Sequence, residues 1–248
     1  MRLKNKETDK GEFAMSKIVE LKNVKKTYRT GEKEFNALDG VDLEIEKGKF
    51  VVILGPSGAG KSTLLNLIGG MDIPTAGQVI VDGEDISGYS EDKLSDYRAG
   101  SVGFIFQFYN ILPTLTVLEN VELVKDIVEN SIDSHVALKK VGLSEHENKF
   151  PNQLSGGEQQ RVSIARAVAK NPKVLLCDEP TGALDSATGV DVLKLLMEQC
   201  KNEGNTVIIV THNSLFADIA DTVIRVKNGK IKSVVQNEAP KSIEEVEW

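Results

Sequence analysis

The chain contains little cysteine and no long hydrophobic run. Its 248 residues include only two cysteines, Cys177 and Cys200, and this usage indicates free thiols in a reducing cytosol rather than a disulfide framework. No apolar stretch approaches the roughly 20 residues that a membrane helix needs, so a role in transport would require another polypeptide to cross the membrane. Residues 1–14 are polar and charged without an apolar centre, which excludes a secretory signal and predicts a disordered leader over 1–15.

An excess of positive charge is also missing. The formal net charge is −7 at pH 7, which argues against nonspecific binding to nucleic acid, and we expect no nucleic-acid partner. Hydrophobic residues make up 40% of the chain and charged residues 27%, as in an ordinary globular protein. Internal repeats are absent as well. We therefore expect a single domain over 16–235, followed by a peripheral acidic tail over 236–248.

A glycine-rich loop follows the apolar run 50–54, which predicts a strand buried on both faces. The loop fits the pattern G-x-x-x-x-G-K-[ST], and helix-like sequence follows it, which argues against a chance glycine turn. Gly58 and Gly60 allow the backbone N–H groups to point at phosphate oxygens, Lys61 reaches the β- and γ-phosphates, and Ser62 is placed to bind Mg²⁺. The helix that begins near Lys61 directs its positive end at the anion. The predicted nucleotide-binding residues of this loop are Gly55, Pro56, Ser57, Gly58, Ala59, Gly60, Lys61, Ser62 and Thr63.

Two adjacent carboxylates end a second apolar run, at Asp178 and Glu179. The carboxyl ends of parallel strands are where such sheets place their chemistry, and neighbouring strand positions point to opposite sides. We therefore expect Asp178 to hold Mg²⁺, mainly through water, and Glu179 to orient and polarise the attacking water. The alternative is a solvated acidic turn, but the buried strand and the phosphate loop favour the catalytic interpretation.

Two further strand ends carry candidate residues. Gln107 follows the apolar run 102–106 and is expected to supply an oxygen to Mg²⁺ or to the attacking water. His212 follows the run 206–210 and is assigned to the γ-phosphate, as a sensor and polariser of the transition state. His135 and His146 lie in polar surroundings, and we expect no catalytic role for either.

A second glycine-rich helix start occupies residues 154–161, with the sequence LSGGEQQR. Ser155 is a strong N-cap for a predicted helix over about 156–170. Gly156 and Gly157 leave the N–H groups of the first turn bare, so that a phosphate can approach them closely. The buried face of this helix is expected to contain Val162, Ile164, Ala165 and Val168.

The order of elements indicates an α/β fold. Residues 18–83 begin with alternating strands, in which Val41, Leu43 and Ile45 share one face. Residues 91–153 are mainly helical, and residues from 155 onward return to buried strands. The helical part has an apolar face, which we expect to be core and not a partner groove, at Val117, Leu118, Val121 and Val124.

The octet at 154–161 matches the signature of the ATP-binding cassette (ABC) ATPases, and over residues 18–235 the chain resembles a nucleotide-binding domain of that family. The resemblance implies a P-loop NTPase fold with a RecA-like parallel core, an antiparallel β subdomain and an inserted helical subdomain at about 91–153. It also implies ATP hydrolysis with Mg²⁺ and a head-to-tail homodimer. Each ATP would lie between the phosphate loop of one chain and the second helix start of the other. The residues implied at that second surface are Ser155, Gly156, Gly157, Glu158 and Asp185, and Tyr28 is the implied aromatic partner of adenine.

Three segments, 28–31, 106–123 and 180–189, resemble the macrolide-exporter and lipoprotein-release branch, whereas 124–136 is shorter than usual there. That branch implies a separate transmembrane permease, a position at the cytoplasmic face of the membrane, and export or mechanotransmission. A non-transport ABC ATPase usually carries a coiled-coil insertion or a second cassette, which this sequence lacks. An importer is less favoured by the same segments. A cassette that drives cell-wall hydrolases through a membrane partner shares these features and stays an alternative.

Overall fold

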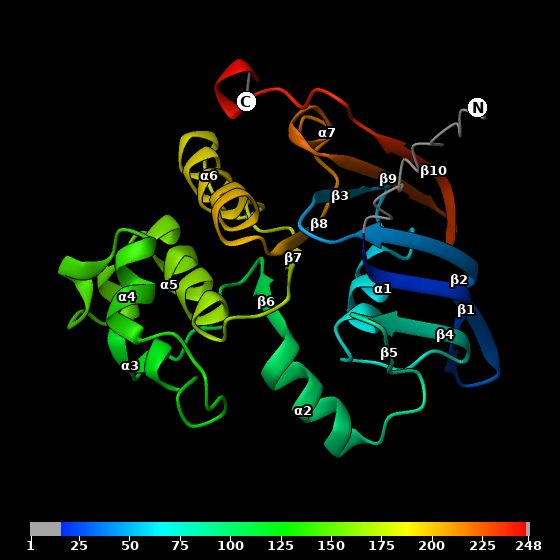
Figure 1. The fold of residues 1–248 in the computed structure, drawn as a ribbon, viewed down its shortest axis with the longest axis horizontal. Helices are drawn as coiled ribbons and strands as arrows, with labels where there is room; N and C mark the ends of the chain where they lie inside the picture. The colour runs from blue at the N-terminus through cyan, green and yellow to red at the C-terminus, as the bar shows by residue number, and fades with distance from the viewer. Residues whose placement is uncertain (1–15, 247–248) are drawn as a thin grey trace, which may run out of the picture.

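A six-stranded, mostly parallel sheet forms the centre of the molecule in the computed structural model, which describes residues 16–246 (Figure 1). The strand order is β10-β9-β3-β8-β7-β6, and every neighbouring pair is parallel except β9 and β10. The strands are β3 (Phe50–Leu54), β6 (Val102–Phe106), β7 (Val174–Asp178), β8 (Thr206–Thr211), β9 (Thr222–Lys227) and β10 (Lys230–Gln236). The carboxyl ends of β3, β6, β7 and β8 therefore meet at one edge, where the predicted site residues follow them.

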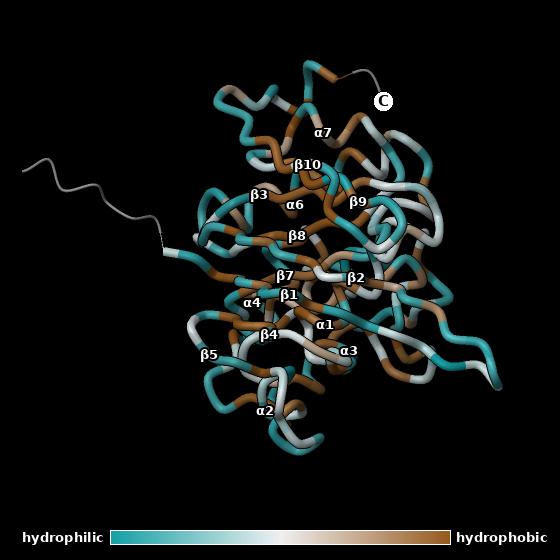
Figure 2. Tube along the Cα trace, turned by 90° about the vertical axis from the view of Figure 1, so that its right-hand side faces the viewer, coloured by the Kyte–Doolittle hydropathy of each residue, from teal (hydrophilic) through white to brown (hydrophobic). Residues whose placement is uncertain are grey.

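Alternating residues of β3 pack into two separate hydrophobic cores. Phe50, Val52 and Leu54 belong to the core on one face of the sheet, and Val51 and Ile53 belong to the core on the other. Successive strand residues point to opposite faces, so a strand covered on both sides needs an unbroken apolar run. Figure 2 shows β3, β8 and β7 as hydrophobic segments at the centre of the molecule. The prediction of a doubly covered parallel sheet is confirmed.

A four-stranded antiparallel sheet covers α1 (Lys61–Ile68) on the side away from the central sheet (Figure 1). Its order is β2-β1-β4-β5, and Val41, Leu43 and Ile45 of β2 are buried as the alternation predicts. The strands are β1 (Lys17–Thr30), β2 (Lys33–Glu46), β4 (Ala76–Val81) and β5 (Glu84–Asp85). The helix α1, which begins at the phosphate loop, is therefore held between the two sheets.

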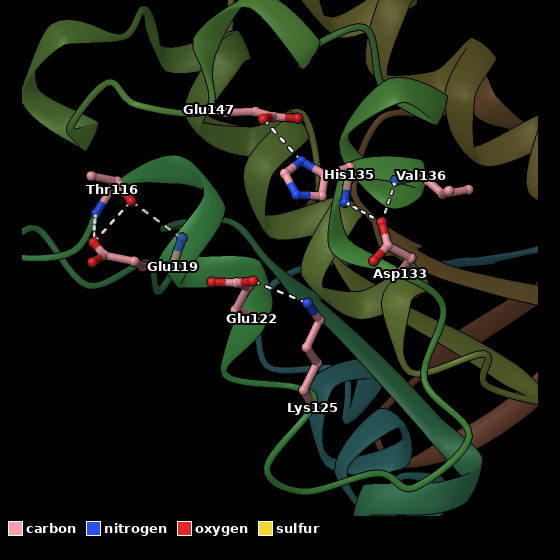
Figure 3. Close-up of polar contacts among 8 residues, drawn as sticks. All are labelled: Thr116, Glu119, Glu122, Lys125, Asp133, His135, Val136 and Glu147. Carbon is pink, nitrogen blue, oxygen red and sulfur yellow. Dashed lines mark hydrogen bonds and ion pairs between the residues drawn. The ribbon is translucent and has the colours of Figure 1, made fainter.

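Short helices pack around α5 (Gly156–Ala169) on the opposite side of the molecule. They are α3 (Val117–Glu122) and α4 (Ser134–Lys140), with the 3-10 turns η1 (Ser144–His146) and η2 (Pro151–Gln153). Figure 3 shows two polar contacts that hold this group, the capping box between Thr116 and Glu119 and the pair formed by His135 and Glu147. The apolar faces predicted for the α3 region and for α5 are both in the core.

Two elements inside the range 91–153 lie in the core domain and not in this helical group. β6 is the edge strand of the central sheet, and α2 (Glu91–Ser101) contributes Leu94 and Tyr97 to the core beside α1. The helical subdomain therefore begins after Gln107. The sequence between 91 and 101 has helical character but no signal that tells which core it joins.

The acidic C-terminal segment, expected to be peripheral, packs against the domain. Ile243 and Val246 are 5% and 8% exposed, and both join the core that contains α6 (Ser186–Glu203) and α7 (Phe216–Ile219). At the turn η3 (Ile243–Glu245), Oε1 of Glu244 lies 3.3 Å from Nζ of Lys194 in α6. The leader 1–15 and Trp248 lie outside the described residues. No helix between residues 16 and 246 is both long enough and apolar enough to cross a bilayer.

Candidate nucleotide-binding and catalytic site

The phosphate loop leaves the first turn of α1 open. Gly60 is the N-cap of α1 at φ 101°, and no side chain caps this helix start. A β-carbon at Gly60 would lie 2.4 Å from the carbonyl oxygen of Ala37, so the position has no room for a side chain. Gly58 also has positive φ, at 74°. The loop therefore presents N–H groups at the positive end of a helix, which suits an anion.

Lys61 folds back along the loop and is 8% exposed. Its amine donates hydrogen bonds to the carbonyl oxygens of Gly55 at 2.8 Å and Pro56 at 3.1 Å. These two residues thus orient the lysine instead of lining the cavity themselves. A buried ammonium group with only carbonyl partners can turn toward a phosphate without breaking an ion pair.

A cavity of about 600 Å³ lies beside this loop, within the usual range for small-molecule sites. It collects residues from six separate segments of the chain. The predicted site residues that line it are Tyr28, Ser57, Gly58, Ala59, Gly60, Lys61, Ser62, Thr63, Gln107, Asp178, Glu179 and His212. The predicted residues Ser155, Gly156, Gly157, Glu158 and Asp185 are not among its lining.

Glu179 directly follows β7, and its carboxylate is held by Thr211 at the end of β8 and by the next residue, His212. Oε2 accepts from the Thr211 hydroxyl at 2.9 Å, and Oε1 accepts from the backbone N–H of His212 at 3.0 Å. Nδ1 of His212 also lies 2.8 Å from Oε1. A carboxylate has about four acceptor positions, so Glu179 is fixed and still has capacity for one more donor, such as a water. In this arrangement His212 positions Glu179, an interaction that sequence analysis did not anticipate.

Asp178, Ser62 and Gln107 all line the cavity and carry side-chain oxygen atoms. Burial raises the pKa of the Asp178 carboxyl, while a hydrogen bond with Ser62 and the charge of Lys61 act in the opposite direction. A carboxylate, a hydroxyl and an amide oxygen are the ligand types that Mg²⁺ prefers. The residues present therefore fit a magnesium ion.

Two aromatic side chains from neighbouring strands line the cavity. Tyr28 of β1 is paired with Phe35 of β2 in the antiparallel register, and both line the cavity. The Tyr28 hydroxyl donates to Oδ2 of Asp72 at 2.8 Å, and the Lys26 amine lies 5.0 Å from the centre of the Tyr28 ring. Phe35 was missed in the sequence. Its signal is a lone aromatic residue in a polar hairpin, 59% exposed in the structure.

The second helix start, at α5, is closed by its own side chains. Glu158 Oε2 accepts from the Ser155 backbone N–H at 2.7 Å and from the Ser155 hydroxyl at 2.8 Å. In return the Glu158 N–H donates to Ser155 Oγ at 3.3 Å, which completes a capping box. These bonds with Ser155 lower the pKa of the Glu158 carboxyl.

Gly156 and Gly157 both lie close to other parts of the chain. A β-carbon at Gly157 would lie 2.1 Å from Cγ2 of Thr188, and one at Gly156 would lie 2.8 Å from the Tyr109 hydroxyl. Asp185 caps α6 by accepting from the N–H and the hydroxyl of Thr188, at 3.0 and 2.7 Å. The glycines predicted to admit a phosphate therefore also join α5 to the start of α6 and to the loop after Gln107.

Comparison with known proteins gives consistent results. A family model described as ABC transporter matches residues 38–182. The chain is 50% identical over 236 residues to a putative ABC transporter ATP-binding protein of Mycoplasma genitalium, covering 93% of this chain and 50% of that protein. It is 45% identical over 224 residues to the macrolide export ATP-binding/permease protein MacB of Campylobacter fetus subsp. fetus, covering 87% of this chain and 34% of that protein. The chain thus spans about half of the first relative and a third of the second.

A solved structure is similar over almost the whole described fold. This is the dimeric ATP-binding cassette MJ0796 in a post-hydrolysis state with ADP and Pi bound. It superimposes with a TM-score of 0.82 at 42% sequence identity, and the match covers 90% of this chain and 100% of that one.

Proposed function

The chain belongs to the ABC transporter family, as an ATP-binding subunit with ATPase activity, and from this premise we propose that two copies close head to tail around two ATP molecules to drive a separate membrane permease. The observation that carries the proposal is the separation of two anion-binding helix starts. The cavity beside α1 contains Lys61, Asp178 and Glu179, whereas none of its lining residues comes from 154–158. One chain therefore holds half of each of two sites, and a two-fold pair completes both.

We assign the ground-state contacts with ATP to the cavity beside α1. The loop N–H groups and Lys61 would bind the phosphates, and Tyr28 with its neighbour Phe35 would hold the adenine. Ser62, Asp178 and Gln107 would hold Mg²⁺, which when bound offsets the negative charge of the phosphates. Of these contacts, the one to Phe35 is suggested by the structure alone.

Hydrolysis would depend on Glu179. Three hydrogen bonds from Thr211 and His212 fix its carboxylate, and one acceptor position remains for the attacking water. Glu179 would orient this water and take its proton, and Gln107 lies in the same cavity to contact water or metal. His212 has its Nδ1 on Glu179, so its role at the γ-phosphate would use the remaining side of the ring.

The partner chain would supply the residues that lie outside the cavity. Ser155, Gly156, Gly157 and Glu158 would face the γ-phosphate of the other chain's ATP. Asp185 would lie at the seam, where it caps α6 beside α5. Since α5 packs on α6 in the same chain, closure at one site moves residues near the other.

We place the permease contact beside Gln107, in the segment from Tyr109 to Leu115. Leu112 in this segment is 46% exposed, and Phe108, the residue just before the segment, is 75% exposed. Exposed apolar side chains that adjoin a site favour a protein partner. The subunit would then act at the cytoplasmic face of the membrane, in export or mechanotransmission. Support comes from the similarity to MacB, whose name combines ATP-binding and permease parts.

The test is affinity purification from membranes with the ATP-trapped Glu179→Gln chain, and mass spectrometry of what is retained. The control is the same chain with Ser155→Arg added, which is expected to bind ATP as a monomer but not to close. Recovery of a permease with a large outer domain, weaker with the control, supports the proposal. Recovery of ribosomes or DNA, or a Ser155→Arg chain that still dimerises with ATP in sizing chromatography, contradicts it.

A further inference from the structure

The proton of the Ser155 hydroxyl is already in use in the isolated chain. Ser155 Oγ donates it to Glu158 Oε2 at 2.8 Å and accepts from the Glu158 N–H. A serine hydroxyl has only one proton to donate. It cannot serve Glu158 and a phosphate oxygen at once, so a hydrogen bond from this hydroxyl to a second chain's nucleotide would take it away from Glu158.

Closure also brings the Glu158 carboxylate toward a phosphate of the same charge sign. Without the Ser155 hydroxyl, Oε2 keeps only the Ser155 backbone N–H at 2.7 Å. A carboxylate that loses a donor next to an anion is destabilised. Some other group must hold and offset Glu158 if the second helix start is to accept a phosphate readily.

His146 is placed to do this from the turn η1. Its Nε2 lies 3.0 Å from Glu158 Oε1, the oxygen that Ser155 does not use. The other ring nitrogen, Nδ1, is buried and has no hydrogen-bond partner among residues 16–246. The polar function of this side chain is thus directed at Glu158 alone. Arg161, one turn further along α5, adds a weaker positive influence on the same carboxylate.

We propose that His146 is a positioning residue: it holds the Glu158 carboxylate while the Ser155 hydroxyl turns from Glu158 to the nucleotide of the second chain. The inference rests on the proposed head-to-tail closure and deepens it. His146 does not touch the nucleotide and acts through Glu158, so its loss affects closure and leaves the chemistry at Glu179 intact.

The first experiment replaces His146 by alanine in the Glu179→Gln chain and titrates ATP-dependent dimerisation by sedimentation. Polar pairs near the protein surface contribute up to about a fivefold factor. Since each dimer closes two sites, we expect the dimer dissociation constant to rise by up to about 25-fold. Backbone bonds of His146 to Leu143 and Lys149 survive the substitution, and binding of ADP to the monomer should not change.

The matched control is His135→Ala in the same background. His135 forms the same kind of pair in the same subdomain, with Nδ1 2.9 Å from Glu147 (Figure 3), but Glu147 does not belong to the α5 start. Both variants lose one imidazole and one carboxylate contact. Only the His146 variant should weaken dimerisation.

Steady-state kinetics and a second variant separate positioning from general structural damage. With Glu179 intact, His146→Ala should raise the KM for ATP by about fivefold and leave kcat within about twofold. His146→Gln, which can place an amide donor near the position of Nε2, should restore most of the affinity. In a Glu158→Gln chain, which has no carboxylate to hold, adding His146→Ala should have little further effect.

The outcomes distinguish failure of the His146 role from failure of head-to-tail closure. If Ser155→Arg abolishes dimerisation and His146→Ala shifts it no more than His135→Ala does, the role of His146 is overturned and head-to-tail closure stands. A fall in kcat at unchanged KM overturns the role too. If Ser155→Arg dimerises normally, closure on the α5 start fails, and the role of His146 fails with it.

Discussion

The two glycine-rich helix starts of this chain differ in how the N–H groups of the first turn are capped. α1 begins at Gly60 with no side-chain cap and no acidic residue in its first turn, and its open N–H groups face a cavity. α5 begins at Ser155 with a complete capping box and Glu158 in its first turn. The unsatisfied donors of a helix start require a partner. At α5 that partner is part of the chain, whereas at α1 no capping side chain among the described residues supplies it and the proposed partner is the nucleotide.

This difference indicates an order of events. The N–H groups of an open start can bind an anion without giving up a side-chain cap, so nucleotide should bind first at α1 in a single chain. A capped start can accept an anion only by exchanging its own hydrogen bonds, which makes the α5 contact weaker and conditional on a phosphate presented by another chain.

The largest effect is expected at the carboxylate beside α1. Glu179→Gln removes the proposed general base but retains a polar group that Thr211 and His212 can hold, so hydrolysis should slow by about 10²–10⁴-fold while ATP binding persists. Phosphate release at saturating ATP measures the rate. The matched control is Glu198→Gln on the exposed side of α6, for which no change is expected. An unaltered rate for Glu179→Gln would show that Glu179 is not the general base.

The next effect concerns the open start itself. Gly60→Ala must adopt φ 101° and place a β-carbon 2.4 Å from the Ala37 carbonyl oxygen, whereas Gly58→Ala at φ 74° meets nothing within 4 Å. The second substitution adds about 1–2 kcal/mol of backbone strain. The first adds a backbone clash to this, so it should weaken ATP binding by about a further tenfold. Calorimetric titration of both variants with ATP compares them. Equal losses would show that the loop relaxes around Ala37.

At the capped start the corresponding test is one of packing. Gly157→Ala places a β-carbon 2.1 Å from Cγ2 of Thr188, and we expect it to reduce the free energy of unfolding by about 1–3 kcal/mol. Thr188→Ser removes that methyl group and retains the hydroxyl that bonds Asp185 at 2.7 Å. The double variant should recover much of the loss in chemical denaturation. Gly156→Ala, which meets only the end of the Tyr109 side chain, should be milder. A double variant as unstable as Gly157→Ala would mean that the backbone of α5 has shifted.

Both helix starts could be predicted from sequence because each depends on residues close together in the chain. The glycines of the phosphate loop and the cap at Ser155 act within a few residues, and α1 and α5 begin where the sequence indicates. The apolar runs likewise predict buried strands, since a run without alternation must be covered on both faces. Both cysteines are buried and free, as their number suggested.

Interactions between distant segments could not be predicted in this way. The contact between His146 and Glu158 and the cross-strand pairing of Tyr28 with Phe35 depend on register and packing that no local pattern encodes. The docking of Ile243 and Val246 is similar, because the acidic composition around them hides these two apolar side chains. The strand order β3-β8-β7-β6 also arises from non-local pairing of parallel strands.

The smallest effect is expected away from both helix starts, at the pair that serves as the control for His146. The hydrogen bond to Glu147 raises the pKa of His135 above its ordinary value. A raised pKa in the folded state means that the pair stabilises the fold below the unfolded value of about 6.5, and that this contribution disappears as the pH rises through the folded value. His135→Gln should therefore lower the Tm slightly at pH 5.5 and leave it unchanged at pH 9. A difference of equal size at both values would show that His135 acts through packing and not through charge.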